Sequence, residues 1–554
     1  MAAFVHPAHR TIWLLLPIAI LVATACSQPT AYNGPQPRTP VKDIPASGQL
    51  KNFELIANNP LLDPKYNLPR GQNGGITAIR DCLYVGSNIG YQPALIVDMK
   101  DMTKPTVVGE VPGIAFKGMG VEAIEGVADL NLLVVTARGG DAKRIATADK
   151  NIGLVVYDAT DCRKPTIVAK VDVGSDLIHY MTLWRDPAKP DRVLVDVNYC
   201  CNGTADGIDL RVFDLTGCPK SCSPKQVAEW GLRAQFGIPQ RLEVAYEGGK
   251  ITKTTVTHDA TWSIDGTRLH VAQMHFGYFQ LDSSALARGQ SCNPKSPTTA
   301  VATGYCLSVL NPDLSARVQP YGIGAAHTHG IVKVPGRPYV AVQHEPSSGC
   351  PYGGIQMVYV GTTETYAPGA IAPGQGQLRG DLFPKVVSEF GLPEDQVDRC
   401  GQNGDPDAAS GLNPNFNGGI HNLMAFPNVM FATWYSGGLR AIDITNPYMP
   451  FELGYFFNKP PQEVRWCQGA GCKDAEVDGE GIPIRQQGTL PPEIIARSYP
   501  IAMNGYLVYA DSNNGVYVLK YTGPHASEIP KQGICIAHNP SVVSVGYEPC
   551  APYK

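Results

Sequence analysis

The stretch ALIVDMKDMTKPTVVGEV, residues 94–111, contains the unit that decides the fold. An apolar run ends at Asp98, a polar segment with Pro105 follows, and a second β-rich run completes the unit. Asp accepts hydrogen bonds from the amides that follow it, and Pro fixes its own φ, so both favour a turn. The stretch therefore predicts two short strands joined by a turn.

The same unit recurs along the chain, which indicates a repeat architecture. Copies are GLVVYDATDCRKPTIVAKV at 153–171, DLRVFDLTGCPK at 209–220, GLRAIDITNPYMPFELGYF at 438–456 and a weaker GVYVLKYTGP at 515–524. At these residues the chain resembles the LVIVD-repeat family, whose name is close to ALIVD at 94–98. The resemblance covers about residues 50 to 522. It implies a β-propeller of four-stranded blades around a central channel, and it implies nothing about activity.

A second recurring piece lies upstream of each copy: an alternating strand, a turn and another strand. There are seven such hairpins, and they begin near Ile76, Val121, His179, His258, His329, His421 and Ser498. The fold class predicted from them is all-β, a seven-bladed β-propeller. The strand at 50–58 is expected to complete the last blade and close the ring.

The ends of the chain differ from the repeats. Residues 1–25 have the composition of a signal peptide, with an apolar run at 12–22 that is too short to span a bilayer. The sequence around Cys26 resembles a bacterial lipoprotein processing box, so we expect lipidation of Cys26; ordinary cleavage nearby is the alternative. Residues 26–49 are expected to be a Pro/Ser/Thr-rich tether, 50–523 the propeller and 524–554 a disulfide-pinned tail.

The mature chain is therefore expected outside the cytoplasm, in the periplasm or at the cell surface, touching the membrane only through its lipid anchor. Cysteine usage agrees with export, because 14 of the 15 cysteines remain once Cys26 is set aside and allow up to seven disulfides. The pairs predicted from spacing are Cys218–Cys222, Cys467–Cys472, Cys292–Cys306 and Cys535–Cys550. The net charge of −4 argues against a nucleic-acid partner.

Four hairpins in succession begin with histidine at the same register: His179, His258, His329 and His421. The first strand of a propeller blade lines the central channel, so these side chains should converge in space. The rim of the same end is expected to carry His275, His327, His344 and Tyr435. Seven of the ten histidines that follow the signal segment fall at this end.

Imidazole is the commonest metal ligand and suits Fe, Cu or Zn. The four histidines are thus candidate metal ligands, and Glu345 and Asp259 are candidate catalytic groups near the ring nitrogens. By architecture the arrangement is similar to the four-histidine iron centre of carotenoid-cleaving oxygenases and to copper-dependent methanethiol oxidases. Here, however, the four histidines come from adjacent blades, which makes a one-sided ring.

Two functions follow from this pattern. The first is a transition-metal-dependent oxidoreductase or oxygenase that acts on a small molecule. The alternative is a non-catalytic surface module that binds protein or glycan, in which the histidines hydrogen-bond neighbouring backbone in the channel.

Overall fold

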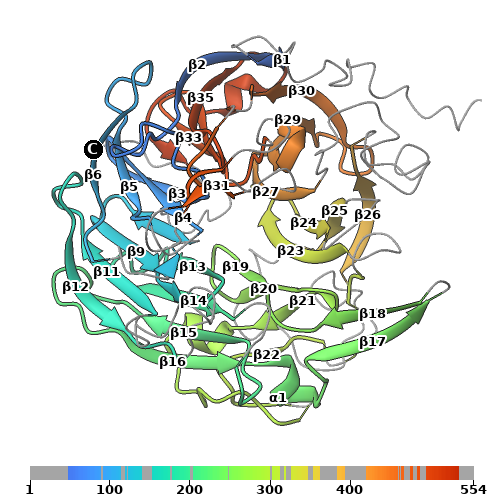
Figure 1. The fold of residues 1–554 in the computed structure, drawn as a ribbon. Coiled ribbons are helices and arrows are strands. Elements are labelled where there is room, and N and C mark those ends of the chain that lie inside the picture. The colour runs from blue at the N-terminus through green and yellow to red at the C-terminus, as the bar shows by residue number, and fades with distance from the viewer. Residues whose placement is uncertain are drawn as a thin grey trace, which may run out of the picture.

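Seven antiparallel sheets are arranged around one axis in the computed structural model (Figure 1). The residues that it describes are 48–88, 92–113, 119–120, 123–139, 153–174, 178–199, 204–246, 249–299, 302–311, 313, 317–319, 326–346, 353–361, 384–392, 419–459, 461, 463–466, 474–477, 483–486 and 494–535. The predicted all-β, seven-bladed propeller is confirmed by these sheets. The signal segment, Cys26 and the tether up to residue 47 lie outside the described residues.

Each blade is a meander whose strands follow one another from the axis outward. Blade 1 consists of β3 (Asn73–Ile79), β4 (Cys82–Ser87), β5 (Leu95–Asp98) and β6 (Thr106–Glu110). Blade 2 consists of β8 (Ile124–Val127), β9 (Leu132–Thr136), β11 (Leu154–Asp158) and β12 (Thr166–Val171). Blade 3 consists of β13 (Tyr180–Arg185), β14 (Val193–Asn198), β15 (Leu210–Asp214) and β16 (Lys225–Trp230). Blades 4 and 5 are β19 (Asp259–Trp262), β20 (Arg268–Gln273), β21 (Gly277–Asp282) and β22 (Ser308–Val309), followed by β23 (Ala326–Lys333), β24 (Tyr339–Pro346), β25 (Gly354–Tyr359) and β26 (Lys385–Phe390). Blades 6 and 7 contain β27 (Ile420–Ala425), β28 (Val429–Trp434), β29 (Gly438–Asp443) and β30 (Phe451–Phe457), followed by β33 (Ile501–Met503), β34 (Tyr506–Asp511) and β35 (Gly515–Tyr521).

The remaining elements are short and lie between the blades or at their edges. They are the pairs β7 (Met119–Gly120) with β10 (Arg138–Gly139), β17 (Arg241–Tyr246) with β18 (Gly249–Thr254) and β31 (Asp474–Val477) with β32 (Pro483–Gln486), together with α1 (Leu232–Phe236), α2 (Ser284–Ala287), η5 (Tyr435–Gly437) and η6 (Ala526–Glu528).

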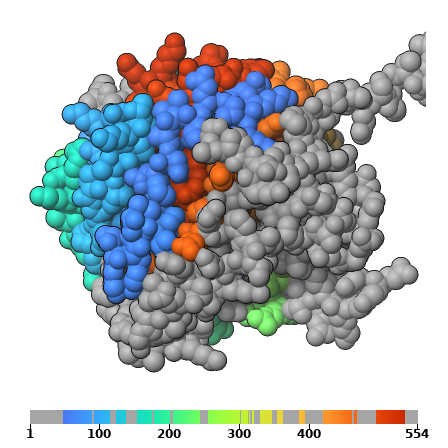
Figure 2. Space-filling model, turned by 45° about the horizontal axis from the view of Figure 1, so that its top comes forward, coloured from blue at the N-terminus to red at the C-terminus, as the bar shows by residue number. Residues whose placement is uncertain are grey.

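The two ends of the propeller segment close the ring together. The N-terminal strand β2 (Phe53–Asn59) pairs with β35 and completes blade 7, as expected for residues 50–58. The preceding β1 (Gln49–Lys51) pairs instead with β30 of blade 6. Figure 2 shows these N-terminal residues in blue beside orange and red residues of the last two blades. The start of the predicted tail also joins the fold, since β36 (Ile534–Cys535) pairs with β33.

The repeated Asp turns behave as their chemistry predicts. In five of the seven blades the third strand ends in an aspartate whose Oδ1 accepts the backbone N–H two residues further on, at 2.8–2.9 Å: Asp98, Asp158, Asp214, Asp282 and Asp443. This Asx contact ends the strand and starts the turn to the outer strand. The repeat in the sequence is therefore a repeated local structure.

The core lies between neighbouring sheets. The middle strands carry apolar side chains on both faces, and all six residues of β14 are buried. Trp184 of blade 3 and Trp262 of blade 4 meet across one such interface with ring centroids 5.9 Å apart. Outer strands such as β6 are mostly exposed. Neighbouring first strands contact each other in chain order from β3 to β27, which places them around the axis.

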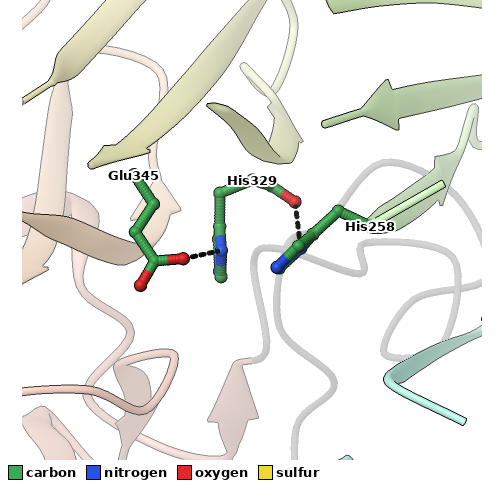
Figure 3. Close-up of side chains that lie close together, drawn as sticks. All are labelled: His258, His329 and Glu345. Carbon is green, nitrogen blue, oxygen red and sulfur yellow. Dashed lines mark hydrogen bonds and ion pairs between the residues drawn. The ribbon is translucent and has the colours of Figure 1, made fainter. Parts of the chain in front are cut away.

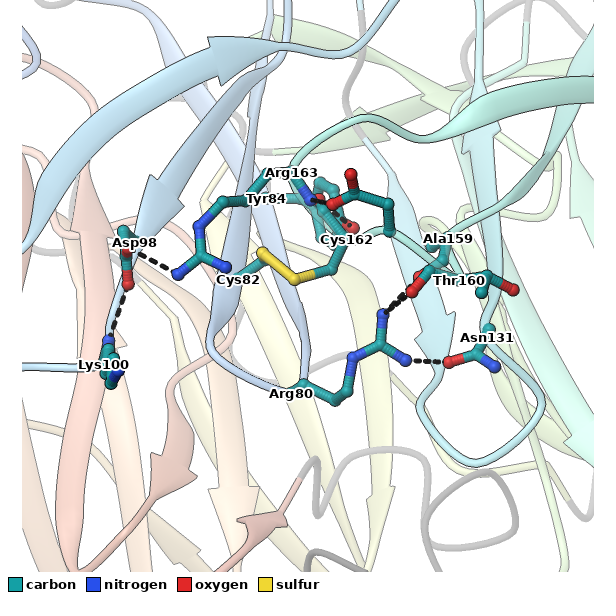
Figure 4. The surroundings of a disulfide bond; sticks show 11 residues. Arg80, Cys82, Tyr84, Asp98, Lys100, Asn131, Ala159, Thr160, Cys162 and Arg163 are labelled. Atoms are coloured by element: carbon teal, nitrogen blue, oxygen red, sulfur yellow. Dashed lines mark hydrogen bonds and ion pairs between the residues drawn. A yellow bond between two sulfur atoms is a disulfide. The ribbon is translucent and has the colours of Figure 1, made fainter.

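Three disulfides are formed within the described residues. Two of them, Cys218–Cys222 and Cys292–Cys306, confirm the spacing-based predictions. The third, Cys82–Cys162, was not predicted and joins β4 of blade 1 to the turn after β11 of blade 2 (Figure 4). Arg80 supports the same junction by donating to the carbonyl oxygens of Ala159 and Thr160. Cys535 is also disulfide-bonded, whereas Cys467, Cys472 and Cys550 lie outside the described residues.

No helix among the described residues has both the length and the apolar character needed to cross a membrane.

Candidate functional site

The four register histidines lie at the beginning of the first strands of blades 3 to 6. The backbone N–H of His179 donates to Asn198 O and that of His258 to Ala272 O, each at 2.8 Å. His329 and His421 are the extra residues of β-bulges, where the register shifts between Thr328 and Gly330 and between Ile420 and Asn422. A bulge re-aims the side chain that it carries. The local backbone thus turns both rings toward their neighbours.

The four rings form a continuous arc. Ring centroids are 4.1 Å apart for His179 and His258, 4.2 Å for His258 and His329, and 4.3 Å for His329 and His421. The Tyr435 ring continues the arc 5.2 Å from His421. All four imidazoles are buried, with exposed fractions of 3–8%. The register therefore brings these side chains together, as neighbouring rings tilted by 48–56° to one another along one side of the channel.

Two of the histidines contact a backbone carbonyl oxygen through Nδ1, and for His258 this contact fixes the tautomer. Nδ1 of His258 contacts the carbonyl oxygen of His329 at 2.9 Å, and Nδ1 of His421 contacts that of Arg497 at 2.9 Å. A carbonyl oxygen only accepts, so Nδ1 of His258 must carry the hydrogen. Nδ1 of His421 also lies 2.8 Å from Nδ2 of Asn422, an amide donor, so its two contacts assign no tautomer to that ring. A neutral ring with its hydrogen on Nδ1 keeps the lone pair of Nε2, and this tautomer can bind a metal through Nε2. Each bond also joins one blade to the next.

Glu345, near the end of β24, completes the centre of the arc (Figure 3). One carboxylate oxygen accepts a hydrogen bond from Nδ1 of His329 at 3.1 Å, and the other accepts one from the Tyr435 hydroxyl. His258, His329 and Glu345 each offer one ligand atom, and these atoms all lie within 4.8 Å of one another. His179 and His421 flank this group, which we call the His258–His329–Glu345 group.

Other predicted rim residues have different surroundings. Nε2 of His344 lies 2.7 Å from Oε1 of Gln356, inside blade 5. Nδ1 of His275 accepts the backbone N–H of Thr254 at 3.1 Å, in the turn between β20 and β21. His327 lies in β23, but its side chain is outside the described part of the structure. The structure thus brings Tyr435 to the arc and places His344 and His275 on other partners.

Asp259, predicted as a catalytic group, interacts with the opposite side of the ring. Its Oδ2 accepts the hydroxyl of Tyr499 at 2.8 Å, and its Oδ1 accepts the N–H of Ala260 at 2.7 Å. Since Tyr499 belongs to blade 7 and Asp259 to blade 4, this contact spans the channel. Burial raises the pKa of Asp259 to about 8; the Tyr499 hydrogen bond opposes the rise, and the charge of Glu125 adds to it.

A second register, which the sequence interpretation missed, lies one residue after the first. Asp259, Gly330 and Tyr499 directly follow the hairpin starts His258, His329 and Ser498. A Cβ placed on Gly330 would lie 3.1 Å from Nε2 of Gln343, 3.1 Å from the Tyr499 hydroxyl and 3.2 Å from Oδ2 of Asp259. Comparing the residue after each hairpin start would have revealed this polar layer.

Carboxyl groups continue the polar interior of the channel. Oδ1 of the fully buried Asp196 accepts Nε1–H of Trp262 at 2.6 Å. Burial, and then the charge of Asp259, raise the pKa of Asp196 well above its usual range. The channel therefore has imidazoles and Glu345 at one end, and burial raises the pKa of the nearby carboxyl groups Asp259 and Asp196. Its imidazole end is the part suited to a cation.

No family model matches the chain, and no curated protein matches it. Solved structures resemble it in fold at low identity. Sqt1 from Chaetomium thermophilum is 13% identical with a TM-score of 0.43, and the match covers 86% of this chain and 100% of Sqt1. A structure of that protein bound to the N-terminus of the ribosomal protein L10 matches at 13% identity and a TM-score of 0.41, covering 81% of this chain and 97% of that chain.

The β-propeller domain of Cps50 (Swd1) from Myceliophteria thermophila is 10% identical with a TM-score of 0.41, covering 81% of this chain and 97% of that domain. At such identities the comparisons concern the fold alone. Membership of the LVIVD-repeat family stays a prediction.

Proposed function

We propose that this protein is a non-catalytic binding module of the propeller type, which takes its ligand at the imidazole end of the channel. The observation that carries the proposal is the hydrogen bonding of the arc. Nδ1 of His258 donates to the carbonyl oxygen of His329, and Nδ1 of His421 lies 2.9 Å from that of Arg497, so both rings are held against the next blade before any ligand arrives. Such preorganisation lowers the entropic cost of binding.

Other side chains, which have no imidazole ring, also join neighbouring blades by a hydrogen bond to a backbone carbonyl oxygen. Oγ1 of Thr261 donates to Ile331 O at 2.7 Å, and Nδ2 of Asn422 donates to Arg497 O at 2.7 Å. A threonine or an asparagine is therefore enough to join two blades here. An imidazole at such a position adds a second ring nitrogen, Nε2, which threonine and asparagine lack.

A thermal-shift panel tests the proposal. Tag-free protein is compared with Glu345→Gln, which removes the carboxylate charge, and with His525→Ala, a partly exposed histidine outside the arc whose partners are Asp443 and Glu528. The panel contains divalent metal ions, oxyanions, amino acids and sugars. We expect at least one ligand to raise the melting temperature of wild type and His525→Ala but not of Glu345→Gln. A panel in which no ligand discriminates Glu345→Gln would contradict binding at this end.

A metal-dependent oxidoreductase or oxygenase is the second candidate. The observation that favours it is the His258–His329–Glu345 group, because two histidines and one carboxylate leave coordination positions open for substrate or oxygen. Oxygen uptake by Fe²⁺-loaded protein with a reductant and a panel of small organic substrates tests it. Substrate-dependent oxygen uptake that is lost in Glu345→Gln would support an enzyme. Oxygen uptake equal to that of free Fe²⁺ would exclude this candidate and favour the binding module.

The location of the module rests on its first 26 residues. We propose export through the signal segment 1–25 and anchoring at Cys26. Labelling with a radioactive fatty acid, with Cys26→Ser as control, tests the anchor.

A further inference from the structure

We propose that one imidazole nitrogen each of His258 and His329 and one carboxylate oxygen of Glu345 bind a single divalent transition-metal ion. This inference rests on the proposed function, in that the metal ion is the ligand of the same end of the channel. It extends the proposal from an unspecified ligand to a stated chemical class.

The distances suit an ion after a small adjustment. The three ligand atoms lie within 4.8 Å of one another, and Nδ1 of His329 is 3.1 Å from the Glu345 carboxylate. A tetrahedral ion with ligand bonds of about 2.0–2.1 Å holds its ligand atoms roughly 3.4 Å apart. The largest separation therefore has to shrink by about 1.4 Å, and the hydrogen that Nδ1 of His329 donates to Glu345 has to leave if that nitrogen is the ligand.

Supporting contacts of these ligands are also present. The second oxygen of Glu345 accepts the Tyr435 hydroxyl, and Nδ1–H of His258 is held by a backbone carbonyl. Such contacts orient metal ligands, and the carbonyl that accepts Nδ1–H also increases the basicity of the imidazole. The rings of His179 and His421 lie against the group on its two sides, at centroid distances of 4.1 Å and 4.3 Å.

The donor set also selects the kind of ion. Mg²⁺ and Ca²⁺ prefer oxygen ligands and, for Ca²⁺, six to eight of them. Two imidazole nitrogens and one carboxylate suit Zn²⁺, Fe²⁺, Co²⁺ or Cu²⁺. Ligand nitrogens must be unprotonated, so binding should weaken as the pH falls.

The test uses Co²⁺, whose visible absorption reports nitrogen ligands, with tag-free full-length protein after chelator treatment. His258→Asn is the first variant, because the asparagine amide can replace Nδ1 in the bond to His329 O while Nε2 is lost. Asn422 already makes such a bond to Arg497 O. Glu345→Gln is the second variant, since it keeps the side-chain volume and removes the charge. His525→Ala is the control for adventitious binding at a surface histidine beside carboxylates.

We expect one Co²⁺ per chain, competition by Zn²⁺, and binding that is weaker by roughly 100-fold or more in each of the two variants but unchanged in His525→Ala. Circular dichroism and melting temperature show whether each variant is folded. If His258→Asn does not fold, the inference is tested by Glu345→Gln alone. Wild type that binds no Co²⁺, or variants that bind it equally well, would overturn the inference. If the ligand panel then finds a non-metal ligand that depends on Glu345, the binding module stands and only the metal is excluded; if it finds none, both fail.

Discussion

Replacing Asp259 with asparagine should remove a pH dependence of stability that a single buried carboxyl group creates. Asp259 is 2% exposed, and its Oδ2 accepts the hydroxyl of Tyr499 across the channel. Asparagine keeps the volume and can still hydrogen-bond to Tyr499 and to the N–H of Ala260. It cannot ionise, so the two proteins differ mainly in one titration.

The sign and size follow from the pKa of Asp259, which burial raises from 3.8 to about 8. Between these values the folded protein holds a proton that the unfolded chain has released. Wild type is therefore fully stabilised by this group below pH 3.8 and loses that stability as the pH rises through about 8. The loss is about 1.4 kcal/mol per pH unit, so from pH 5 to pH 7 it amounts to about 3 kcal/mol.

Urea unfolding of wild type, Asp259→Asn and the exposed control Asp191→Asn at several pH values measures this difference. Other buried carboxyl groups titrate as well and cancel in the comparison, except Asp196, whose pKa the charge of Asp259 raises and whose pKa should therefore be lower in Asp259→Asn. We expect the free energy of unfolding of Asp259→Asn, relative to wild type, to improve by about 3 kcal/mol between pH 5 and pH 7. A difference that stays constant over this range would show that Asp259 is already ionised and would refute the reasoning.

Three further perturbations test the packing. Gly330→Ala places a methyl group 3.1–3.2 Å from three polar atoms and should lower the free energy of unfolding by about 1–3 kcal/mol, measured in urea; unchanged stability would mean that the layer is loose. Replacing both Cys82 and Cys162 with alanine opens a loop of 80 residues and should cost about 4 kcal/mol by the same assay, and a loss well below 1 kcal/mol would contradict a structural role for this bridge. Trp262→Phe removes the donor to the buried Asp196 and should cost about 1–3 kcal/mol by the same assay; unchanged stability would contradict the contact.

Repetition explains why the fold could be predicted. Asp98 and Asp158 end the third strands of two blades and make the same turn, so one local rule, applied along the chain, gives the blades. The histidine arc was predictable for a related reason. Residues at one register on the first strands of neighbouring blades must lie side by side, whatever their separation in sequence.

The features of the site that could not be predicted depend on contacts between residues that no local sequence pattern relates. Asp259 and Tyr499 are 240 residues apart, and their bond arises from closure of the ring. His344 and Glu345 are neighbours in sequence, yet the first joins Gln356 within the blade and the second faces the arc. Successive strand residues point to opposite faces of the sheet, and a bulge in the partner strand β23 shifts the pairing. The face to which His344 and Glu345 each point could therefore not be assigned from their spacing in the sequence.

The imidazole arc also combines two tasks in the same side chains. Nδ1 of His258 stabilises the contact between blades 4 and 5, whereas its Nε2 faces the place where we expect the ion. A substitution to alanine would remove both roles together. The pair His258→Asn and His258→Gln separates them, because asparagine places its amide near the Nδ1 position and glutamine near the Nε2 position. We expect the first to keep the stability and lose the metal.

The most direct measurement is anomalous diffraction at the absorption edge of the metal, from crystals of Co²⁺- or Zn²⁺-loaded protein. The account predicts one strong peak at about 2.0–2.2 Å from a nitrogen of His258, a nitrogen of His329 and an oxygen of Glu345. A channel without a peak in fully loaded crystals, or a peak that lies on other residues while these three side chains keep their present contacts, would contradict it.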